Sequence, residues 1–219
     1  MPNQIRFLLR FSKKGFARFL SHRELLNGIE QALRRSLIPI SFSEGFNPRP
    51  RISFPTALPL GMPSADEIMF IQLAEWMNPN DITRKINAKL TEDIRIISSE
   101  PAHQDKTTGS IKSGFKVEYL IKPLTQEAQK NLSKITNEKI TLWLKQSIQN
   151  IQRTYLNKAN KTINVRPYVD SIKISENTIF LVIIITNEGT ARPDEVLFSL
   201  GVSGDLKSDY FIQKTKTLI

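Results

Sequence analysis

The chain has 219 residues, of which 40% are hydrophobic, and it carries a formal net charge of +10 at pH 7. This hydrophobic content is normal for a globular protein with a core, so the composition excludes a chain that is disordered throughout. The absence of cysteine excludes an iron–sulfur cluster, a thiolate zinc site and a cysteine nucleophile in this chain.

The apolar runs and the N-terminus indicate the cellular location of the protein. No apolar run approaches the roughly 18 residues that a membrane span needs. The N-terminus also lacks the apolar stretch and the small-residue cleavage site of a signal peptide. We therefore expect a cytoplasmic protein without a membrane partner. The two histidines, His22 and His103, leave little for a metal site, and we expect neither a metal nor another cofactor.

The positive charge is concentrated at the start of the chain. Residues 1–51 hold ten basic and three acidic side chains, a net charge of +7. Residues 52–100 hold four basic and seven acidic groups, or −3, and residues 101–219 hold seventeen and eleven, or +6. An arginine-rich segment of this kind predicts a face that binds a polyanion or an acidic protein surface.

The first half of the chain predicts strands that alternate with two helices. An apolar run at 5–11, followed by a basic turn at 12–15, predicts a strand. Ser21 and Glu24 have the spacing of a capping box, and the apolar residues that follow predict a helix from about His22 to Ser36. Asn78 and the residues after it predict a second helix start. Further strands are predicted over 38–43, 51–54, 67–74 and 94–98.

The second half repeats this order after a polar stretch without periodicity at 101–113, which predicts a linker between residues 1–100 and 114–219. The predicted elements are a strand at 115–121, helical material at 126–150, strands at 166–174 and 178–186, a helix at 193–200 and a strand at 210–214. We therefore expect an α+β protein of two tandem ferredoxin-like (split βαβ) units with antiparallel sheets, the first of them with an extra strand.

Residues 43–54, SEGFNPRPRISF, predict a stiff and protruding loop. Its glycine can take positive φ, and its two prolines fix φ near −65° and remove two backbone donors. In an extended backbone Arg49 and Arg51 would project to the same side, and Phe46 would offer an aromatic face nearby. Such a loop could grip a phosphate chain with an unstacked base, or it could be a rigid connection whose arginines are only solvated.

One flank of the first predicted helix is polar. Arg23, Asn27, Glu30 and Arg34 fall within about 60° of arc on a helical projection. This flank can contact phosphates, or it can be a solvated face on which Arg34 pairs with Glu30. Together with the loop, it supplies the predicted nucleic-acid-binding residues: Arg18, Arg23, Asn27, Arg34, Phe46, Asn47, Arg49 and Arg51.

His22 is the one weak candidate for catalysis. A neutral histidine at a helix N-terminus could act as a general base near pH 7. Its helical phase, however, matches the apolar stripe of the helix and predicts a buried or half-buried residue that anchors it. No Walker loop, dinucleotide fingerprint, HExxH site or nucleophile elbow is present. Arg166 and Arg192, each followed by proline, are predicted to have structural roles.

The segment RFSKKGFARFLSHRELLNGIEQALRRSLIPISFSEGFNPRPRISFPTALPLG, with VRPYVDSIKI and TARPDEVLFSLG further on, resembles the radical SAM-linked protein family, which carries the DUF2344 domain. The linker at 101–113 departs from the family's pattern. The resemblance implies an accessory module paired with, or fused to, a radical SAM protein that holds the iron–sulfur cluster. The family has no established catalytic residues, so its motif positions here are candidates only: His22, Glu44, Gly45, Phe46, Asn47, Pro48 and Pro50.

These observations lead to three functional hypotheses. The first is a non-catalytic accessory module that binds RNA, either tRNA or rRNA, for a separate radical SAM enzyme. The second is a protein-interaction adaptor whose basic face docks on the radical SAM partner. The third is a metal-independent endoribonuclease that uses His22.

Overall fold

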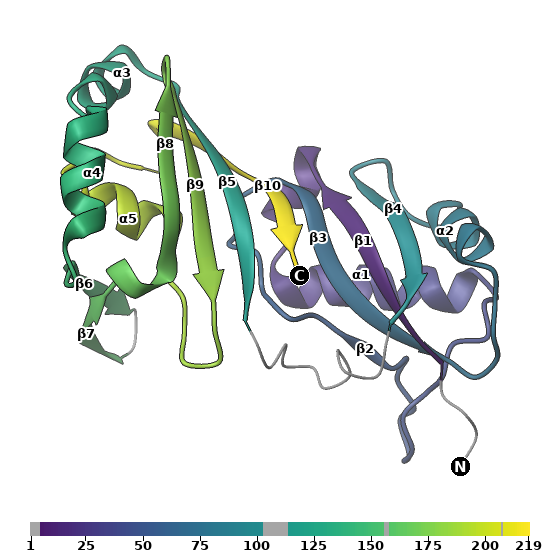
Figure 1. Ribbon diagram of the computed structural model, residues 1–219. Coiled ribbons are helices and arrows are strands. Elements are labelled where there is room, and N and C mark those ends of the chain that lie inside the picture. Colours follow the sequence, from purple (N-terminus) through teal and green to yellow (C-terminus); the bar gives the residue numbers. More distant parts are fainter. Residues whose placement is uncertain (1–4, 103–113, 156–157, 207) are drawn as a thin grey trace. The chain divides into compact units, whose positions relative to one another are not determined.

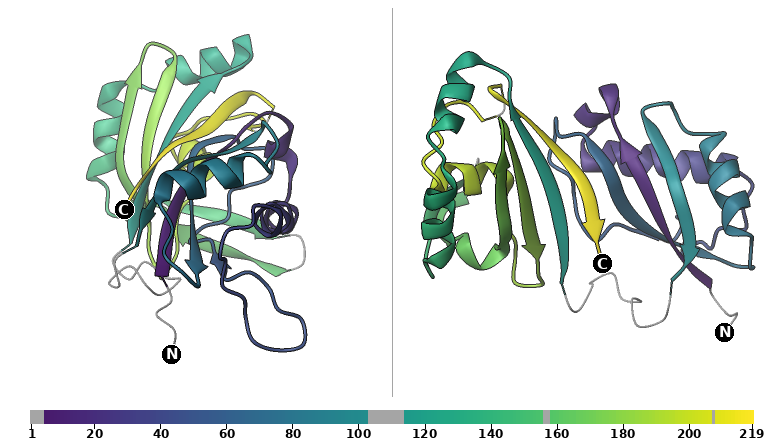
Figure 2. Two further views of the ribbon diagram at one scale, coloured as in Figure 1. Left: turned by 90° about the vertical axis from the view of Figure 1, so that its right-hand side faces the viewer. Right: turned by 45° about the horizontal axis from the view of Figure 1, so that its top comes forward.

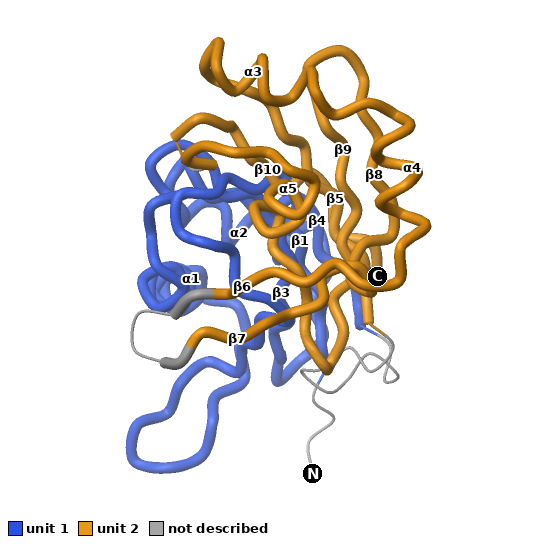
Figure 3. Tube along the Cα trace, turned by 90° about the vertical axis from the view of Figure 1, so that its left-hand side faces the viewer, with its two compact units in different colours: residues 1–112 blue, residues 113–219 orange. Residues whose placement is uncertain are grey.

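The computed structural model describes residues 5–102, 114–155, 158–206 and 208–219. The chain divides into two compact units, Met1–Lys112 (unit 1) and Ser113–Ile219 (unit 2) (Figures 1 and 3). The chain is a mixed α+β protein with mostly antiparallel strand pairing, which confirms the predicted class. Most of the predicted linker and His103 lie outside the described residues.

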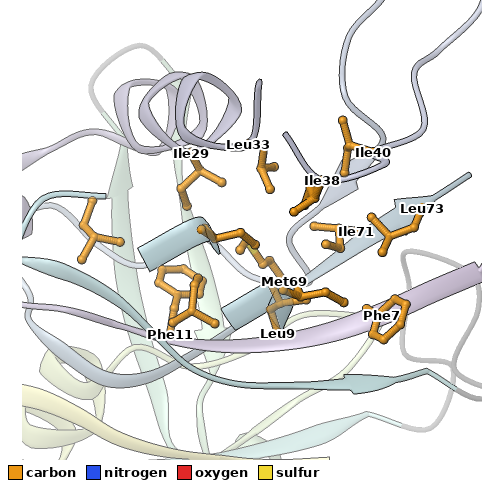
Figure 4. Packing of buried hydrophobic residues seen from close by; sticks show 14 of the residues in the cluster. Phe7, Leu9, Phe11, Ile29, Leu33, Ile38, Ile40, Met69, Ile71 and Leu73 are labelled. Atoms are coloured by element: carbon orange, nitrogen blue, oxygen red, sulfur yellow. The ribbon is translucent and has the colours of Figure 1, made fainter. Parts of the chain in front are cut away.

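Unit 1 places two helices on one face of an antiparallel sheet. Strand β4 lies beside β1, β1 beside β3, and β2 pairs with β3. The helices and the inner faces of the strands share one hydrophobic cluster, part of which is shown in Figure 4. The elements are β1 (Ile5–Lys13), the 3₁₀ helix η1 (Gly15–Phe19), α1 (His22–Arg35), β2 (Ile52–Ser53), β3 (Ser64–Leu73), α2 (Pro79–Asn87) and β4 (Ile94–Pro101).

The start of α1 agrees with the predicted capping box. The Ser21 hydroxyl accepts the backbone N–H of Glu24 at 3.3 Å, and the Glu24 carboxylate accepts the backbone N–H of Ser21 at 2.8 Å. These two bonds satisfy donors that the first turn of a helix otherwise leaves without partners. Leu25, Ile29 and Leu33 then point from α1 into the core (Figure 4 shows the last two). The first turn of α1 is thereby fixed.

The prediction of a strand at 38–43 is wrong. This segment makes only isolated bridges, Ile40 to Leu73 and Phe42 to Pro50, and β2 is reduced to two residues. Proline supplies no backbone donor, so the prolines in and around this segment interrupt the ladder that a continuous strand would need. The element order of unit 1 is therefore β-α-β-β-α-β, without the extra strand.

Leu37 follows the helix cap Ser36 and is strained. It has a φ of 54° and an 84% exposed side chain, so it takes the left-handed conformation that glycine usually adopts after a helix. We expect Leu37→Gly to raise the free energy of unfolding by about 1 kcal/mol, because glycine has no Cβ to strain there. Urea denaturation measures the change. Leu37→Ala, which keeps the Cβ, should leave stability nearly unchanged, and an equal gain in both variants would contradict the explanation.

Unit 2 is built in a similar way: its antiparallel strands have the order β10-β5-β9-β8, and a separate hairpin pairs β6 with β7. α3 contacts β5, and α4 contacts β8. Among the described residues, no helix is long and apolar enough to cross a membrane. The elements are β5 (Phe115–Pro123), α3 (Gln126–Ser133), α4 (Asn137–Lys145), β6 (Asn150–Tyr155), β7 (Lys158–Asn164), η3 (Arg166–Tyr168), β8 (Val169–Ser175), β9 (Thr178–Ile185), α5 (Pro193–Ser199) and β10 (Tyr210–Leu218).

The helical material predicted at 126–150 is two helices followed by a strand. α3 ends at Ser133 with Lys134 as its cap, and Thr136 caps α4, because its side chain accepts the backbone N–H of Lys139 at 3.2 Å. The hairpin of β6 and β7 was not predicted. The predicted strand at 166–174 begins instead with the turn η3, where Arg166 donates to the carbonyls of Leu144 and Val169. These bonds agree with the structural role predicted for Arg166.

A buried ion pair joins β6 to α5. The Nε and Nη2 atoms of Arg153 donate to the two carboxylate oxygens of Glu195 at 2.5 and 2.6 Å. Nη2 also donates to the Thr190 carbonyl at 3.0 Å, and the carboxylate accepts the Arg192 backbone N–H at 2.8 Å. The side chains are only 15% and 8% exposed, so this pair forms part of the interior of unit 2.

Candidate nucleic-acid interface

An open groove of about 510 Å³ lies between α1 and the loop that leads to β2. We call residues 43–51 the proline loop; it stands away from the sheet of unit 1 (Figures 2 and 3). The groove brings together four of the predicted binding residues and two others. It is lined by Asn27, Glu30 and Arg34 from α1 and by Asn47, Pro48 and Arg49 from the proline loop.

Hydrogen bonds between Ser43 and Arg49 help to close the proline loop at its base. The backbone N–H of Ser43 donates to the Arg49 carbonyl at 2.8 Å, and the Arg49 N–H donates to the Ser43 hydroxyl at 3.0 Å. Gly45 has a φ of 113°, which confirms the predicted use of its conformational freedom. Phe46 is fully exposed at the end of the loop. The loop therefore presents an aromatic ring from a closed backbone.

Arg34 connects α1 to the proline loop. Its Nη2 donates to the Pro48 carbonyl at 2.8 Å, and its guanidinium carbon lies 4.9 Å from the centre of the Phe42 ring. Arg34 forms no ion pair with Glu30 among the described residues. One wall of the groove is thus held against the other by a guanidinium that also contributes positive charge.

Arg49 and Arg51, which were predicted to act together, have different surroundings. The Nε of Arg51 donates to the Phe42 carbonyl at 3.1 Å, and its side chain is half-buried against the base of the proline loop. Arg49 is exposed and lines the groove. Arg49 is therefore the better placed of the two to meet a phosphate, and Arg51 supports the loop.

The comparison with known families agrees with the resemblance noted in the sequence. The model of the family described as "Uncharacterized protein conserved in bacteria (DUF2344)" matches residues 6–193. The chain belongs to the DUF2344 family. The match covers unit 1 from its first strand onward, with the groove and the proline loop, and most of unit 2. None of the curated proteins compared with this DUF2344 chain matches it.

Arg18 and Arg23 of the DUF2344 chain do not line the groove. Arg23 is exposed on the first turn of α1. Arg18 lies on η1, where its guanidinium carbon is 4.6 Å from the centre of the Phe19 ring. The eight predicted residues therefore divide between the groove, the tip and base of the proline loop, the first turn of α1 with Arg23, and η1 with Arg18.

Apart from Arg18, the surface around η1 was not predicted. The carboxylate of Asp93 accepts the backbone N–H groups of Phe16 at 2.8 Å and Ala17 at 3.2 Å, and this holds η1 in place. From it, Phe16 and Phe19 project with 86% and 54% of their surface exposed. The signal in the sequence is a pair of phenylalanines directly after a basic turn. Exposed aromatic residues on a fixed backbone are typical of contact surfaces.

The prediction that His22 is buried or half-buried is wrong. His22 is exposed, and its ring contacts Phe54 edge-on with 5.4 Å between the ring centres. His22 lies one turn before Leu25, the first buried residue of α1, and its ring lies against Phe54, which is only partly buried and packs against the core cluster. His22 is not among the residues that line the groove.

Two titratable groups beside the start of α1 have shifted pKa values. Burial lowers the pKa of Lys13, and the charges of Glu67 and Glu24 partly oppose this shift. The Nζ of Lys13 donates to the Leu20 carbonyl at 2.8 Å. Hydrogen bonds from Ser21 lower the pKa of Glu24. Neither group lines the groove. Within the described ranges, no group of three or more His, Asp or Glu side chains could hold a metal ion.

Proposed function

We propose that this DUF2344 chain is a non-catalytic accessory module that binds RNA, either tRNA or rRNA, for a separate radical SAM enzyme of the cytoplasm. The observation that carries the proposal is the convergence of Arg34, Arg49 and two amide side chains on one groove, with Phe46 exposed on the same loop. Guanidinium groups suit phosphate oxygens, and an exposed aromatic ring suits an unstacked base.

The charge distribution supports the same partner. The groove lies within the first 51 residues, which carry a net charge of +7. A positive segment attracts a polyanion over distances of about a Debye length, roughly 8 to 10 Å at moderate salt. The groove then supplies short-range contacts that a uniformly basic surface would lack.

We infer further that the two units are ferredoxin-like. When the strands of each unit are numbered along the chain, with the separate hairpin of β6 and β7 left out, the strands of each unit have the order 4-1-3-2. Both units also have the element order β-α-β-β-α-β, with α3 and α4 in the first helical position of unit 2. This is the order of the split βαβ arrangement.

The radical SAM partner in this proposal rests on the family resemblance. Without cysteine, this chain cannot ligate an iron–sulfur cluster through thiolates, so the cluster would belong to the partner protein. The role left for this chain is to present RNA to that partner.

Loss of one groove cation gives the first test. We expect Arg49→Ala to weaken binding of a fluorescently labelled tRNA about fivefold at low salt. The negative slope of log K against log salt should become shallower by about 0.7 to 0.9, the value of one phosphate contact. Fluorescence anisotropy at several salt concentrations measures both quantities.

Arg84→Ala is the matched control, because it removes the same charge from an exposed position on α2 that pairs with Asp81 outside the groove. It should retain most of the affinity. Absence of RNA binding at low salt, or identical curves for the wild type and Arg49→Ala, would refute the proposal.

The surface around η1 favours a second candidate function, the adaptor that docks on the partner enzyme. Its exposed Phe16 and Phe19 lie beside Arg18, and an apolar centre with a basic neighbour suits an acidic, partly apolar protein surface. Co-purification of the partner after nuclease treatment separates the two functions. A complex that survives nuclease supports the adaptor, whereas a complex lost with the RNA supports the RNA-binding module.

A further inference from the structure

The groove contains one carboxylate, and its presence there requires an explanation. Glu30 lines the groove beside Arg34 and across from Arg49. A groove built only to hold phosphates would gain nothing from a negative side chain, because the carboxylate repels the backbone of the RNA. The side chain is half-buried at this position. A ligand group that lies against Glu30 would have to donate hydrogen bonds to it.

The neighbouring arginine does not neutralise this carboxylate. Arg34 lies four residues after Glu30 on the same helix, a spacing that permits an ion pair. Its guanidinium instead donates to the Pro48 carbonyl and stacks on Phe42. Glu30 makes no ion pair and no side-chain hydrogen bond in the part of the chain that the structure describes. Both of its oxygens remain available as acceptors in the groove.

Two amides add to these acceptors. Asn27 lies one turn before Glu30 on α1, and Asn47 comes from the opposite wall. Neither side chain has a hydrogen-bond partner among the described residues. Each amide offers an acceptor and two donors. The groove thus holds a mixed set of donors and acceptors, which suits the polar edge of a base better than a phosphate alone.

We propose that the groove reads one guanine base of the RNA, with the Glu30 carboxylate accepting hydrogen bonds from the N1–H and N2–H of that base. The proposal rests on the proposed function and names what the same site selects. Guanine offers two adjacent donors on its Watson–Crick edge, which match the two oxygens of a carboxylate. An amide of Asn27 or Asn47 can donate to the neighbouring O6.

The other bases fit this carboxylate less well. Adenine and cytosine each offer one amino group beside a ring nitrogen with a lone pair, and uracil offers one N–H between two carbonyls. In each case one carboxylate oxygen would face an acceptor on the base. The groove volume of about 510 Å³ also leaves room for a base and its sugar, since small-ligand sites commonly span about 300 to 1,000 Å³.

Binding of short single-stranded RNAs tests the proposal. The probes are labelled uridine octamers with one central guanosine, inosine, adenosine or cytidine, measured by fluorescence anisotropy at low salt. We expect the guanosine probe to bind about tenfold more tightly than the adenosine and cytidine probes, because a good bidentate base contact discriminates by about this factor or more. Inosine, which lacks the N2 amino group, should bind between them.

Glu30→Gln provides the second measurement. It should remove most of the preference for guanosine while the adenosine probe binds equally or more tightly, because a negative charge leaves the groove. Glu92→Gln makes the same charge change at an exposed position of unit 1 that does not line the groove, and it should keep the preference.

The outcomes separate the two proposals. Equal affinities for all four probes, or a guanosine preference that Glu30→Gln leaves intact, would overturn the proposal that the groove recognises guanine. Neither result would contradict RNA binding. Absence of binding by every probe and by tRNA would overturn the proposed function as well.

Discussion

Arg153→Ala is expected to lower the free energy of unfolding of unit 2 by about 3 to 5 kcal/mol, the usual cost of removing one partner of a buried ion pair. The reason is that Glu195 stays behind with only 8% of its side chain exposed and without its guanidinium. Urea denaturation followed by Trp143, which is buried in unit 2, measures the loss. The replacement Trp76→Phe removes the fluorescence of the other tryptophan of the chain, so that Trp143 alone reports on unfolding.

The controls for this prediction lie in the same unit. Lys116→Ala breaks a more exposed ion pair with Asp170 and should cost no more than about 1 kcal/mol. Replacing both buried partners, Arg153→Met with Glu195→Leu, should restore much of the stability, because an apolar pair leaves no buried charge. A loss for Arg153→Ala no larger than that for Lys116→Ala would show that the buried pair contributes little.

We expect Arg34→Ala to weaken RNA binding more than any other single replacement in the groove, by about thirtyfold, which corresponds to roughly 2 kcal/mol. The replacement removes a groove cation, the hydrogen bond to the Pro48 carbonyl and the stacking on Phe42. The last two contacts hold the proline loop against α1, so the variant also has to order the loop when RNA binds. Fluorescence anisotropy with tRNA measures the change.

The variant Arg34→Lys separates the contribution of the positive charge from that of the guanidinium's contacts with the proline loop. Lysine keeps the positive charge but lacks the planar guanidinium that bonds the carbonyl and stacks on the ring. We expect it to keep the salt dependence of the wild type and to recover only part of the affinity. Full recovery by Arg34→Lys would mean that charge alone matters and that the loop contacts of Arg34 play no part in binding.

The parts of the fold that depend on local patterns could be predicted from the sequence. The start of α1 was predicted because Ser21 and Glu24 satisfy each other's backbone within one turn, and the spacing of Leu25, Ile29 and Leu33 identifies the buried face. The candidate loop was predicted for the same reason, since glycine and proline restrict the backbone wherever they occur. These signals need no knowledge of distant residues.

Other features depend on contacts between distant residues and could not be predicted. Arg153 and Glu195 lie 42 residues apart, and no local pattern pairs them. Arg34 can reach either Glu30 or the proline loop, and only the folded loop decides between them. His22 has the phase of a buried residue, but Phe54 occupies that position beside the helix. In each case the choice is made by tertiary packing.

Mapping of RNA crosslinks tests the central claim most directly. The purified protein is irradiated with bound tRNA, digested with trypsin and analysed by mass spectrometry for peptides that carry nucleotide adducts. Our account predicts adducts on the peptide of residues 36–51, which contains the exposed Phe46 and the groove residue Arg49, and on residues of α1. Adducts confined to unit 2, with none on the proline loop or α1, would contradict it.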